Sequence, residues 1–250
     1  MSRHAAIAAA LAVFVTTECF AAATDAPGKA APGQVIYDAA KAVELGRALA
    51  TELRSLRPEA SFTNTGTLFI KAKRQPLVKV TYTCRVEVTA TNWTSHYSAR
   101  RGTNVLPGFS VEYRAGQPNL YRDDTGKILS GSQLDVSFAG SDFWLSDLGL
   151  EFFHWPEQRV PRWEMARHCG CKVLESKNPL ATPTGYSRIV SWIHDESGGI
   201  VQAKAYDARG ELLKEFLPTE LEKINGRHEL KEMRIENTQT GSSTRLEFDL

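Results

Sequence analysis

Two short motifs carry residue types that can bind a metal ion. His168-Cys169-Gly170-Cys171 offers an imidazole and two thiols, a donor set that suits zinc or copper. A closed site needs a fourth ligand with its own spacing, and the sequence has no second Cys/His pair. Glu151 and His154 form one Glu-x-x-His motif, whereas a di-iron site on a helix bundle needs two. A structural cysteine and a polar helix surface therefore explain these residues better than a metal does.

The motifs of nucleophilic and nucleotide chemistry are missing from the sequence. It contains no Gly-x-Ser-x-Gly, His-Glu-x-x-His, phosphate-binding glycine loop or dinucleotide fingerprint. Two carboxylate pairs occur, Asp142 with Asp147 and Asp195 with Glu196, but helix caps and turns account for both. Because no pattern joins a nucleophile, a base and an orienting group, the chain is predicted to be non-catalytic and to use no cofactor.

Residues 140–155 (GSDFWLSDLGLEFFHW) hold five aromatic residues. The sequence predicts a helix that Ser141 caps and Pro156 ends. Phe143, Leu150 and Phe153 fall on other sides of this helix than its main apolar stripe. Within one arc of about 100° lie Trp144, Leu145, Leu148, Phe152 and Trp155. Such a stripe is either a core helix buried between a sheet and a lid, or one wall of a cavity that an apolar ligand shares.

The first residues are typical of a secretory signal peptide. Arg3 precedes an apolar run over residues 5–16, and small residues follow at the expected cleavage site near Ala23. Cys19 suggests lipid attachment, but Glu18 directly before it is the wrong residue for that signal. We therefore expect cleavage, a periplasmic mature protein and no transmembrane segment in the mature chain.

Charge gives no sign of a nucleic-acid or membrane-surface partner. The chain has 30 Lys and Arg residues against 29 Asp and Glu residues. A nucleic-acid-binding domain normally carries a clear basic excess. The balanced charge thus disfavours nucleic acid and anionic membranes as partners.

Three cysteines remain after the predicted cleavage: Cys84, Cys169 and Cys171. An exported protein with an odd number of cysteines is expected to form one disulfide and to keep one thiol. Cys84 has the apolar parity of its predicted strand, so we expect it to pair with Cys171, or else with Cys169. A bond between Cys169 and Cys171 would be strained.

Beyond the lead-in, the sequence changes from a helical period to an alternating one. Residues 24–36 are rich in Ala, Pro and Gly and are predicted to be disordered, ahead of a single domain over residues 37–250. A helix is predicted for residues 38–56, capped by Asp38, and a further helical stretch for residues 128–137. Strands are predicted for residues 60–73, 76–90, 92–100, 105–114, 116–124, 162–175, 185–195, 199–207, 211–216, 228–237 and 243–250.

This pattern predicts a mainly β (α+β) fold. A sheet of about ten antiparallel strands cannot stay flat, so it should curl strongly around an apolar interior. About three helices, or a ligand, would then fill that interior. The expected architecture is a strongly curled antiparallel sheet that forms a half-open β-barrel, closed on one side by these helices.

Four segments of the second half of the chain follow one another in order: GSDFWLSDL (140–148), CKVLESKNP (171–179), GYSRIVSWIHDESGGIVQAKAYDARGELLKEF (185–216) and EMRIENTQTGSSTRLEFDL (232–250). This succession resembles the LolA/LolB-like family of outer-membrane lipoprotein-sorting proteins. His194 departs from the residue that the family more often has before the acid. Before about residue 130 only the arrangement of elements is similar.

The resemblance implies a LolA-like half-barrel with an apolar cavity, and a non-catalytic periplasmic carrier of lipid or lipoprotein acyl chains for outer-membrane lipoprotein sorting. The alternative is an envelope sensor or scaffold of the same fold that binds a protein partner. From the helical wheel and strand parity we predict the cavity-lining residues to be Trp144, Leu148, Phe152 and Trp155 on one wall and Phe69, Val78, Val80 and Tyr82 on the other.

Overall fold

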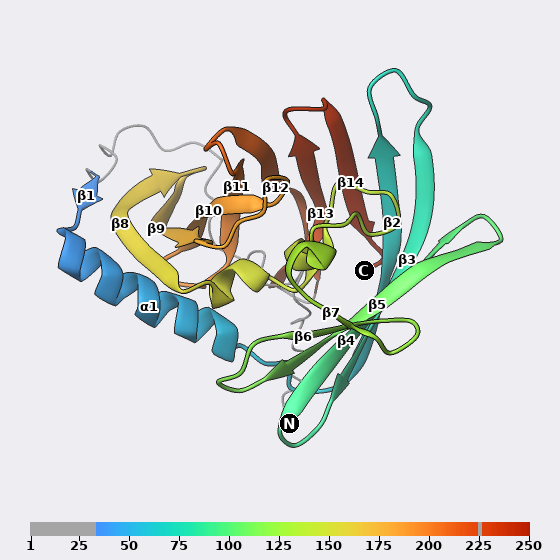
Figure 1. The fold of residues 1–250 in the computed structure, drawn as a ribbon, viewed down its shortest axis with the longest axis horizontal. Helices are drawn as coiled ribbons and strands as arrows, with labels where there is room; N and C mark the ends of the chain where they lie inside the picture. Colours follow the sequence, from blue (N-terminus) through green and yellow to red (C-terminus); the bar gives the residue numbers. More distant parts are fainter. Residues whose placement is uncertain (1–33, 225–226) are drawn as a thin grey trace.

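The computed structural model describes residues 34–224 and 227–250, most of which belong to one antiparallel sheet (Figure 1). The predicted signal peptide and most of the lead-in lie outside these residues. Val35–Ile36, which we expected to be disordered, instead form the short strand β1 and pair with Arg162 and Trp163. No helix in the described ranges is both long and apolar enough to cross a membrane.

Among the described residues the sheet contains fourteen strands in the order β1-β8-β9-β10-β11-β12-β13-β14-β2-β3-β4-β5-β6-β7, and all neighbouring pairs run antiparallel. The strands after β1 are β2 (Phe62–Lys71), β3 (Val78–Val88), β4 (Asn92–Arg101), β5 (Asn104–Arg114), β6 (Leu120–Asp123), β7 (Ile128–Leu129), β8 (Glu157–Ala166), β9 (Cys169–Lys177), β10 (Tyr186–His194), β11 (Ile200–Asp207), β12 (Leu212–Ile224), β13 (Arg227–Asn237) and β14 (Ser242–Phe248).

The sheet is open, because β1 and β7 are its two ends and do not pair with each other. The expectation of a mainly antiparallel β fold is confirmed, but the helices are fewer than expected. The described residues form two α-helices, α1 (Ala39–Ser55) and α2 (Leu145–Leu148), of which α2 is a single turn. Two 3-10 turns, η3 (Gly131–Leu134) and η4 (Glu151–His154), accompany α2.

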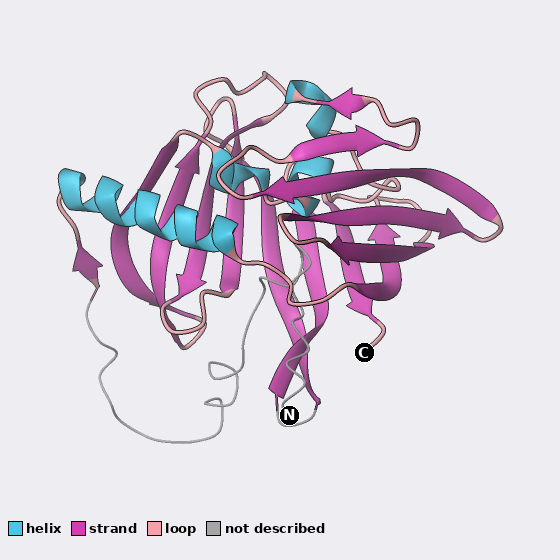
Figure 2. Ribbon diagram, turned by 90° about the horizontal axis from the view of Figure 1, so that it is seen from below, coloured by secondary structure: helices cyan, strands magenta, loops and turns pink. Residues whose placement is uncertain are grey.

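Helix α1 lies across the β8 end of the sheet (Figure 2). It begins as predicted, since the Asp38 side chain accepts a hydrogen bond of 2.9 Å from the backbone N–H of Lys41. Gly46 allows the close approach: a Cβ atom there would lie 2.2 Å from the Cα atom of Arg159 on β8. The apolar stripe of α1 is buried as expected, except for Leu56, which follows the helix and is exposed.

The sheet has two apolar faces of very different size. The inner face carries the large core, which includes Cys84 on β3 and residues from nearly every strand. The outer face carries a small cluster over β8 to β11, which includes Cys171 on β9. The predicted disulfide between Cys84 and Cys171 is therefore wrong. Both residues are buried free thiols, and they lie on opposite faces with strands β10 to β14 and β2 between them.

Two boundaries differ from the sequence prediction because of local backbone geometry. The region predicted as one strand over residues 162–175 is a hairpin of β8 and β9, which turns at Arg167 and His168 with φ angles of 49° and 68°. Neither residue is a glycine or asparagine, so the turn has no signature in the sequence. The predicted helix over residues 128–137 is instead the short strand β7 followed by η3.

Candidate functional site

A segment that we call the plug, residues 135–155, packs on the inner face of the sheet between its two ends (Figure 1). The single helix predicted for residues 141–155 is wrong. Trp144 precedes the short helix α2, Leu150 has a left-handed φ of 50°, and η4 follows. The left-handed residue interrupts the helical period, so positions on either side of it do not share one stripe.

Burial within the plug consequently differs from the helical wheel. Phe143 and Phe153, expected on other faces, are only 1% and 2% exposed. Trp144 and Trp155, expected in the stripe, are only partly buried. Leu148 and Phe152 are buried as predicted. The plug therefore directs apolar side chains inward from several sides, as an irregular loop can and a single helix cannot.

Strand β14 fixes one end of the plug through Asp142. The backbone N–H of Asp142 donates to the Thr244 hydroxyl at 2.9 Å, and that hydroxyl donates to the Asp142 carboxylate at 2.8 Å. The Ser242 hydroxyl donates to the same carboxylate. Ser141, predicted to cap a helix, instead bonds within its own turn and donates to the Phe138 carbonyl at 2.7 Å.

A buried ion pair lies at the centre of the plug. Lys214 on β12 is 1% exposed, and its Nζ atom donates to the Asp142 carbonyl at 2.7 Å. The same Nζ lies 3.6 Å from the Asp147 carboxylate and 3.6 Å from the centroid of the Trp144 ring. Tyr186 on β10 donates to Asp147 at 3.1 Å and stacks on Trp144 at a centroid distance of 4.3 Å.

Burial sets the protonation tendencies of this group. Loss of water lowers the pKa of Lys214 to about 8, although the neighbouring Asp147 and Asp142 oppose that change. Burial raises the pKa of Asp147, against the opposing effects of Lys214 and of the Trp144 and Tyr186 hydrogen bonds. Near Asp147, burial raises the pKa of Asp135 to about 6. The charged pair is thus costly to bury and needs all of its partners.

The side chains of three further residues hold the other end of the plug. The Tyr97 hydroxyl on β4 donates to the Leu148 carbonyl at 3.1 Å. The Asn119 amide donates to the Gly149 carbonyl at 2.9 Å. Gln158 on β8 donates to the carbonyls of Phe152 and Trp155, both at 2.9 Å. The plug is therefore bonded to strands from both ends of the sheet.

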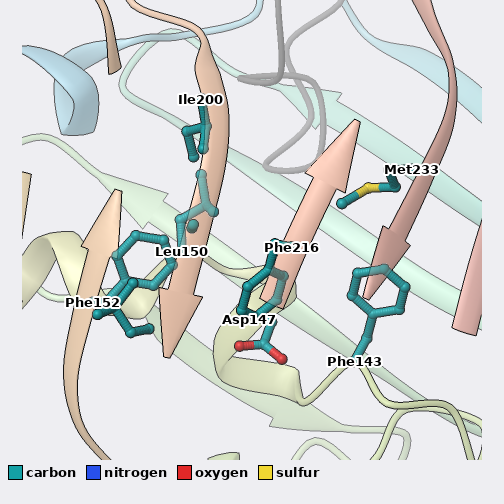
Figure 3. Close-up of a pocket in the computed structure, with 9 residues that line it drawn as sticks. Phe143, Asp147, Leu150, Phe152, Ile200, Phe216 and Met233 are labelled. Atoms are coloured by element: carbon teal, nitrogen blue, oxygen red, sulfur yellow. The ribbon is translucent and has the colours of Figure 1, made fainter. Parts of the chain in front are cut away.

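Little space remains beneath the plug. The cavity there has a volume of about 10 Å³ (Figure 3), which is the room needed for one water molecule. Its lining is apolar apart from one carboxylate, and consists of Phe143, Asp147, Leu150, Phe152, Ile189, Ile200, Ala203, Phe216 and Met233. The rings of the plug pack against protein in this conformation.

The structure separates the predicted cavity residues into three groups. Only Phe152 lines the small cavity, while Trp144, Leu148 and Trp155 pack around it in the same core. Val78, Val80 and Tyr82 lie on the inner face of β3, away from that cavity; Tyr82 meets Phe248 edge-on at 6.3 Å. Phe69, which was predicted to line the cavity, instead lies on the outer face between Lys79 and Arg245. Their cationic groups are 5.3 and 4.1 Å from the centroid of its ring.

Sequence reasoning missed the polar residues that hold the plug. Tyr186, Lys214 and Thr244 lie 39, 72 and 102 positions after the plug residues that they contact, and no local pattern joins them to the plug. One signal was present, since Asp142 and Asp147 are carboxylates in an otherwise apolar stretch. A buried carboxylate requires a partner, and a search for inward-facing polar residues on strands would have found Lys214.

The described side chains offer no metal centre, because no three His, Cys, Asp or Glu residues among them are grouped to hold an ion. Glu151 and His154 lie on the same 3-10 turn. Burial raises the pKa of Glu151 to about 7 and lowers that of His154 to about 4, the latter helped by Arg54. At neutral pH the His154 imidazole is therefore uncharged, while Glu151 is close to the midpoint of its titration.

Comparison with known proteins places the chain in a family. Residues 117–249 match the model of a family with the description "Uncharacterized protein". The chain belongs to this family. No curated protein matches its sequence. The match begins just before the plug and covers every strand from β6 to β14, so the family includes the segment described above.

Solved structures show that the fold is LolA-like. A DUF1329 family protein from Desulfovibrio piger is 21% identical, with a TM-score of 0.65 over 84% of this chain and 92% of that one. A domain from Vibrio parahaemolyticus that carries the name outer membrane lipoprotein-sorting protein is 19% identical, with a TM-score of 0.61 over 83% and 92%. A LolA superfamily protein from Nitrosomonas europaea is 16% identical, with a TM-score of 0.56 over 84% and 92%. The LolA-like resemblance is confirmed at the level of the fold.

Proposed function

We propose that the protein is a non-catalytic periplasmic carrier that binds acyl chains of a lipid or lipoprotein for outer-membrane lipoprotein sorting. The acyl chains would lie against the inner face of the sheet, where the plug now packs. The sheet and plug would then act as a half-open β-barrel. Similar solved structures support the fold, and one of them carries a lipoprotein-sorting name.

The observation that carries this proposal is the chemistry beneath the plug. Apart from Asp147, the residues that enclose the small cavity are all apolar, and they come from both the plug and the strands. An acyl chain gains about 0.8 kcal/mol for each CH₂ group that it buries. Movement of the plug would expose a surface that water disfavours and that an acyl chain would cover.

The plug has the features of a segment that can move as a unit. Its backbone is irregular, and polar contacts with Thr244, Lys214 and Tyr97 hold it in place. Because the cavity has a volume of only about 10 Å³, an acyl chain can enter only when these contacts open. Binding would thus exchange plug–sheet contacts for ligand–sheet contacts.

One variant tests this exchange. Thr244→Val keeps the side-chain shape but removes the hydroxyl that holds Asp142, so the plug should open more easily and take up a fluorescent fatty-acid probe faster than the unmodified protein. Thr81→Val is the matched control, because Thr81 is exposed and its hydroxyl bonds to the Arg100 carbonyl instead. Native mass spectrometry of protein purified from a bacterial envelope should show bound lipid. If no lipid co-purifies, and neither the unmodified protein nor Thr244→Val takes up the probe, the carrier proposal is wrong.

The same packing favours a second candidate function, an envelope scaffold or sensor that binds a protein partner. A scaffold needs no ligand space, and the cavity of about 10 Å³ is what such a protein would have. In that case the plug would be a permanent part of the core. A chain that fails both lipid assays while it captures one envelope protein reproducibly would support the scaffold instead.

A further inference from the structure

A second site lies beside the plug, at the end of α1. We call it the arginine cleft. It has a volume of about 610 Å³, within the usual size range of small-molecule sites. The C-terminal end of α1, the adjoining ends of β4 and β5, the loop after β5 and the turn η4 enclose it. Neither the sequence analysis nor the carrier proposal gives it a role.

The charge of the cleft is concentrated and positive. Arg54, Arg57 and Arg114 line it, and among the described residues Glu151 is the one acidic residue in its lining. The complete chain has a formal net charge of only +1, so these three guanidinium groups form a local excess. His154, which also lines the cleft, adds no positive charge at neutral pH because burial lowers its pKa to about 4.

The three arginines are not equally available. Arg57 already donates to the backbone carbonyls of Thr89, Ala90 and Asn92, so it shapes the wall. Arg54 is exposed and donates to Thr51 at 3.0 Å. Arg114 is exposed, and its Nε atom lies 3.8 Å from Glu112, which does not line the cleft. Arg54 and Arg114 therefore keep N–H donors that can face a ligand.

One wall of the cleft is apolar. Trp93 on β4 and Tyr113 on β5 stack with ring centroids 3.7 Å apart, and both rings line the cleft. Leu56, just beyond α1, is 43% exposed and lines it as well. A ligand that fits both features has an anionic group and an apolar part.

We propose that the arginine cleft binds a phosphate-bearing ligand, with its phosphate between Arg54 and Arg114 and its apolar part against Leu56 and the Trp93–Tyr113 pair. Guanidinium groups match the oxygens of phosphate in two-pronged hydrogen bonds. A phosphate has enough oxygens and charge to be shared by arginines from two different elements. The source of the phosphate is either a lipid headgroup or a free phosphate compound.

Titration calorimetry of the complete chain tests the site with two probes, inorganic phosphate and monomeric dihexanoyl phosphatidylglycerol. Arg54→Gln and Arg114→Gln should each weaken binding of both probes by about ten-fold, the loss expected when one charged hydrogen bond is removed. Arg101→Gln is the matched control, because Arg101 is exposed at the opposite end of β4. It should leave both affinities unchanged.

Leu56→Ser separates the two sources of phosphate. If the ligand is a lipid headgroup, this change weakens phosphatidylglycerol binding and leaves phosphate binding unchanged. Equal affinity for both probes, with no effect of Leu56→Ser, identifies free phosphate as the source.

Two results would overturn the site: neither probe binds, or Arg101→Gln weakens binding as much as the cleft variants do. Uptake of the fatty-acid probe beneath the plug should not depend on Arg54. The proposal for the arginine cleft and the proposal for the acyl carrier can therefore be contradicted independently of each other.

Discussion

The plug and the arginine cleft meet at Glu151, yet one is closed and the other is open. Beneath the plug about 10 Å³ is left, with an apolar lining, whereas the cleft has about 610 Å³ and three arginines. Polar groups are used differently in the two places. Around the plug they bond to one another and fasten a segment, while in the cleft Arg54 and Arg114 are exposed. The cavity volume alone therefore does not identify the surface on which the proposed carrier would bind an acyl chain.

The ion pair under the plug should give the largest effect. Lys214→Met removes the cation that Asp147 and the Asp142 carbonyl share, and leaves a buried carboxylate without its partner. We expect the free energy of unfolding to fall by about 3–5 kcal/mol, as is typical when one member of a buried pair is lost. Urea unfolding followed by circular dichroism measures this change.

The double variant Lys214→Met/Asp147→Asn sharpens the result. It removes the stranded charge, so it should be more stable than Lys214→Met alone. If the double variant is less stable than the single one, the two groups are not coupled, and the polar fastening of the plug was assigned wrongly.

Glu151, at the boundary of the two regions, should make stability depend on pH. Its folded pKa of about 7 lies above the ordinary value of 4.5, because burial disfavours the carboxylate. The stabilising contribution of the protonated form is complete below pH 4.5 and is lost as the pH rises through 7. Glu151→Gln should therefore match the unmodified protein at pH 4 and be more stable at pH 9, by up to about 3 kcal/mol.

Thermal unfolding at several pH values checks this prediction. Glu112→Gln, a change in a carboxylate outside the cleft, serves as the control. A constant difference between Glu151→Gln and the unmodified protein from pH 4 to pH 9 would contradict the assignment.

A single hydrogen bond of the plug should have a smaller effect. Tyr97→Phe removes the donor to the Leu148 carbonyl and should lower the free energy of unfolding by about 1 kcal/mol. Tyr206→Phe is the control, because no hydrogen bond of the Tyr206 hydroxyl occurs within the described residues and the change should be nearly neutral. Chemical denaturation measures both, and equal effects would mean that Tyr97 does not fasten the plug.

The reactivity of the thiols provides a test that needs no variant of the protein. Burial raises the pKa of both Cys84 and Cys171 to about 12, so neither is a thiolate at neutral pH. Iodoacetamide should modify these two residues only after unfolding, as peptide mapping by mass spectrometry would show. A Cys84–Cys171 crosslink in the native protein would contradict their placement on opposite faces.

The sequence was most informative where side chains alternate regularly. Val78, Val80, Tyr82 and Cys84 were assigned to one face of a strand, and all four belong to the inner core. The N-terminus of α1 was also predicted correctly, because a capping aspartate acts within one turn of the chain. Both features depend on neighbours only a few positions apart, so a single sequence contains the information.

The candidate site was harder to predict because its geometry depends on distant residues. The left-handed conformation of Leu150 breaks the helical period, and a leucine at this position does not indicate such a conformation. Phe69 was predicted to face the interior, yet it packs against the side chains of Lys79 and Arg245 on the outer face. The disulfide predicted for Cys84 was also inferred without knowledge of which strands are neighbours, because strand order is a property of the whole fold.

The two ends of the open sheet have a consequence for self-association. The sheet tapers at both ends: β5 has 11 residues, β6 has 4 and β7 has 2, and β1 beside β8 also has 2. An unpaired edge is a template on which a strand of another molecule can add, and a long flat edge favours aggregation. Ile36 and Ile128 are exposed on these outermost strands, but so short an edge gives an incoming strand few backbone groups to pair with. The tapered ends thus leave an incoming strand only two residues to pair with on each outermost strand.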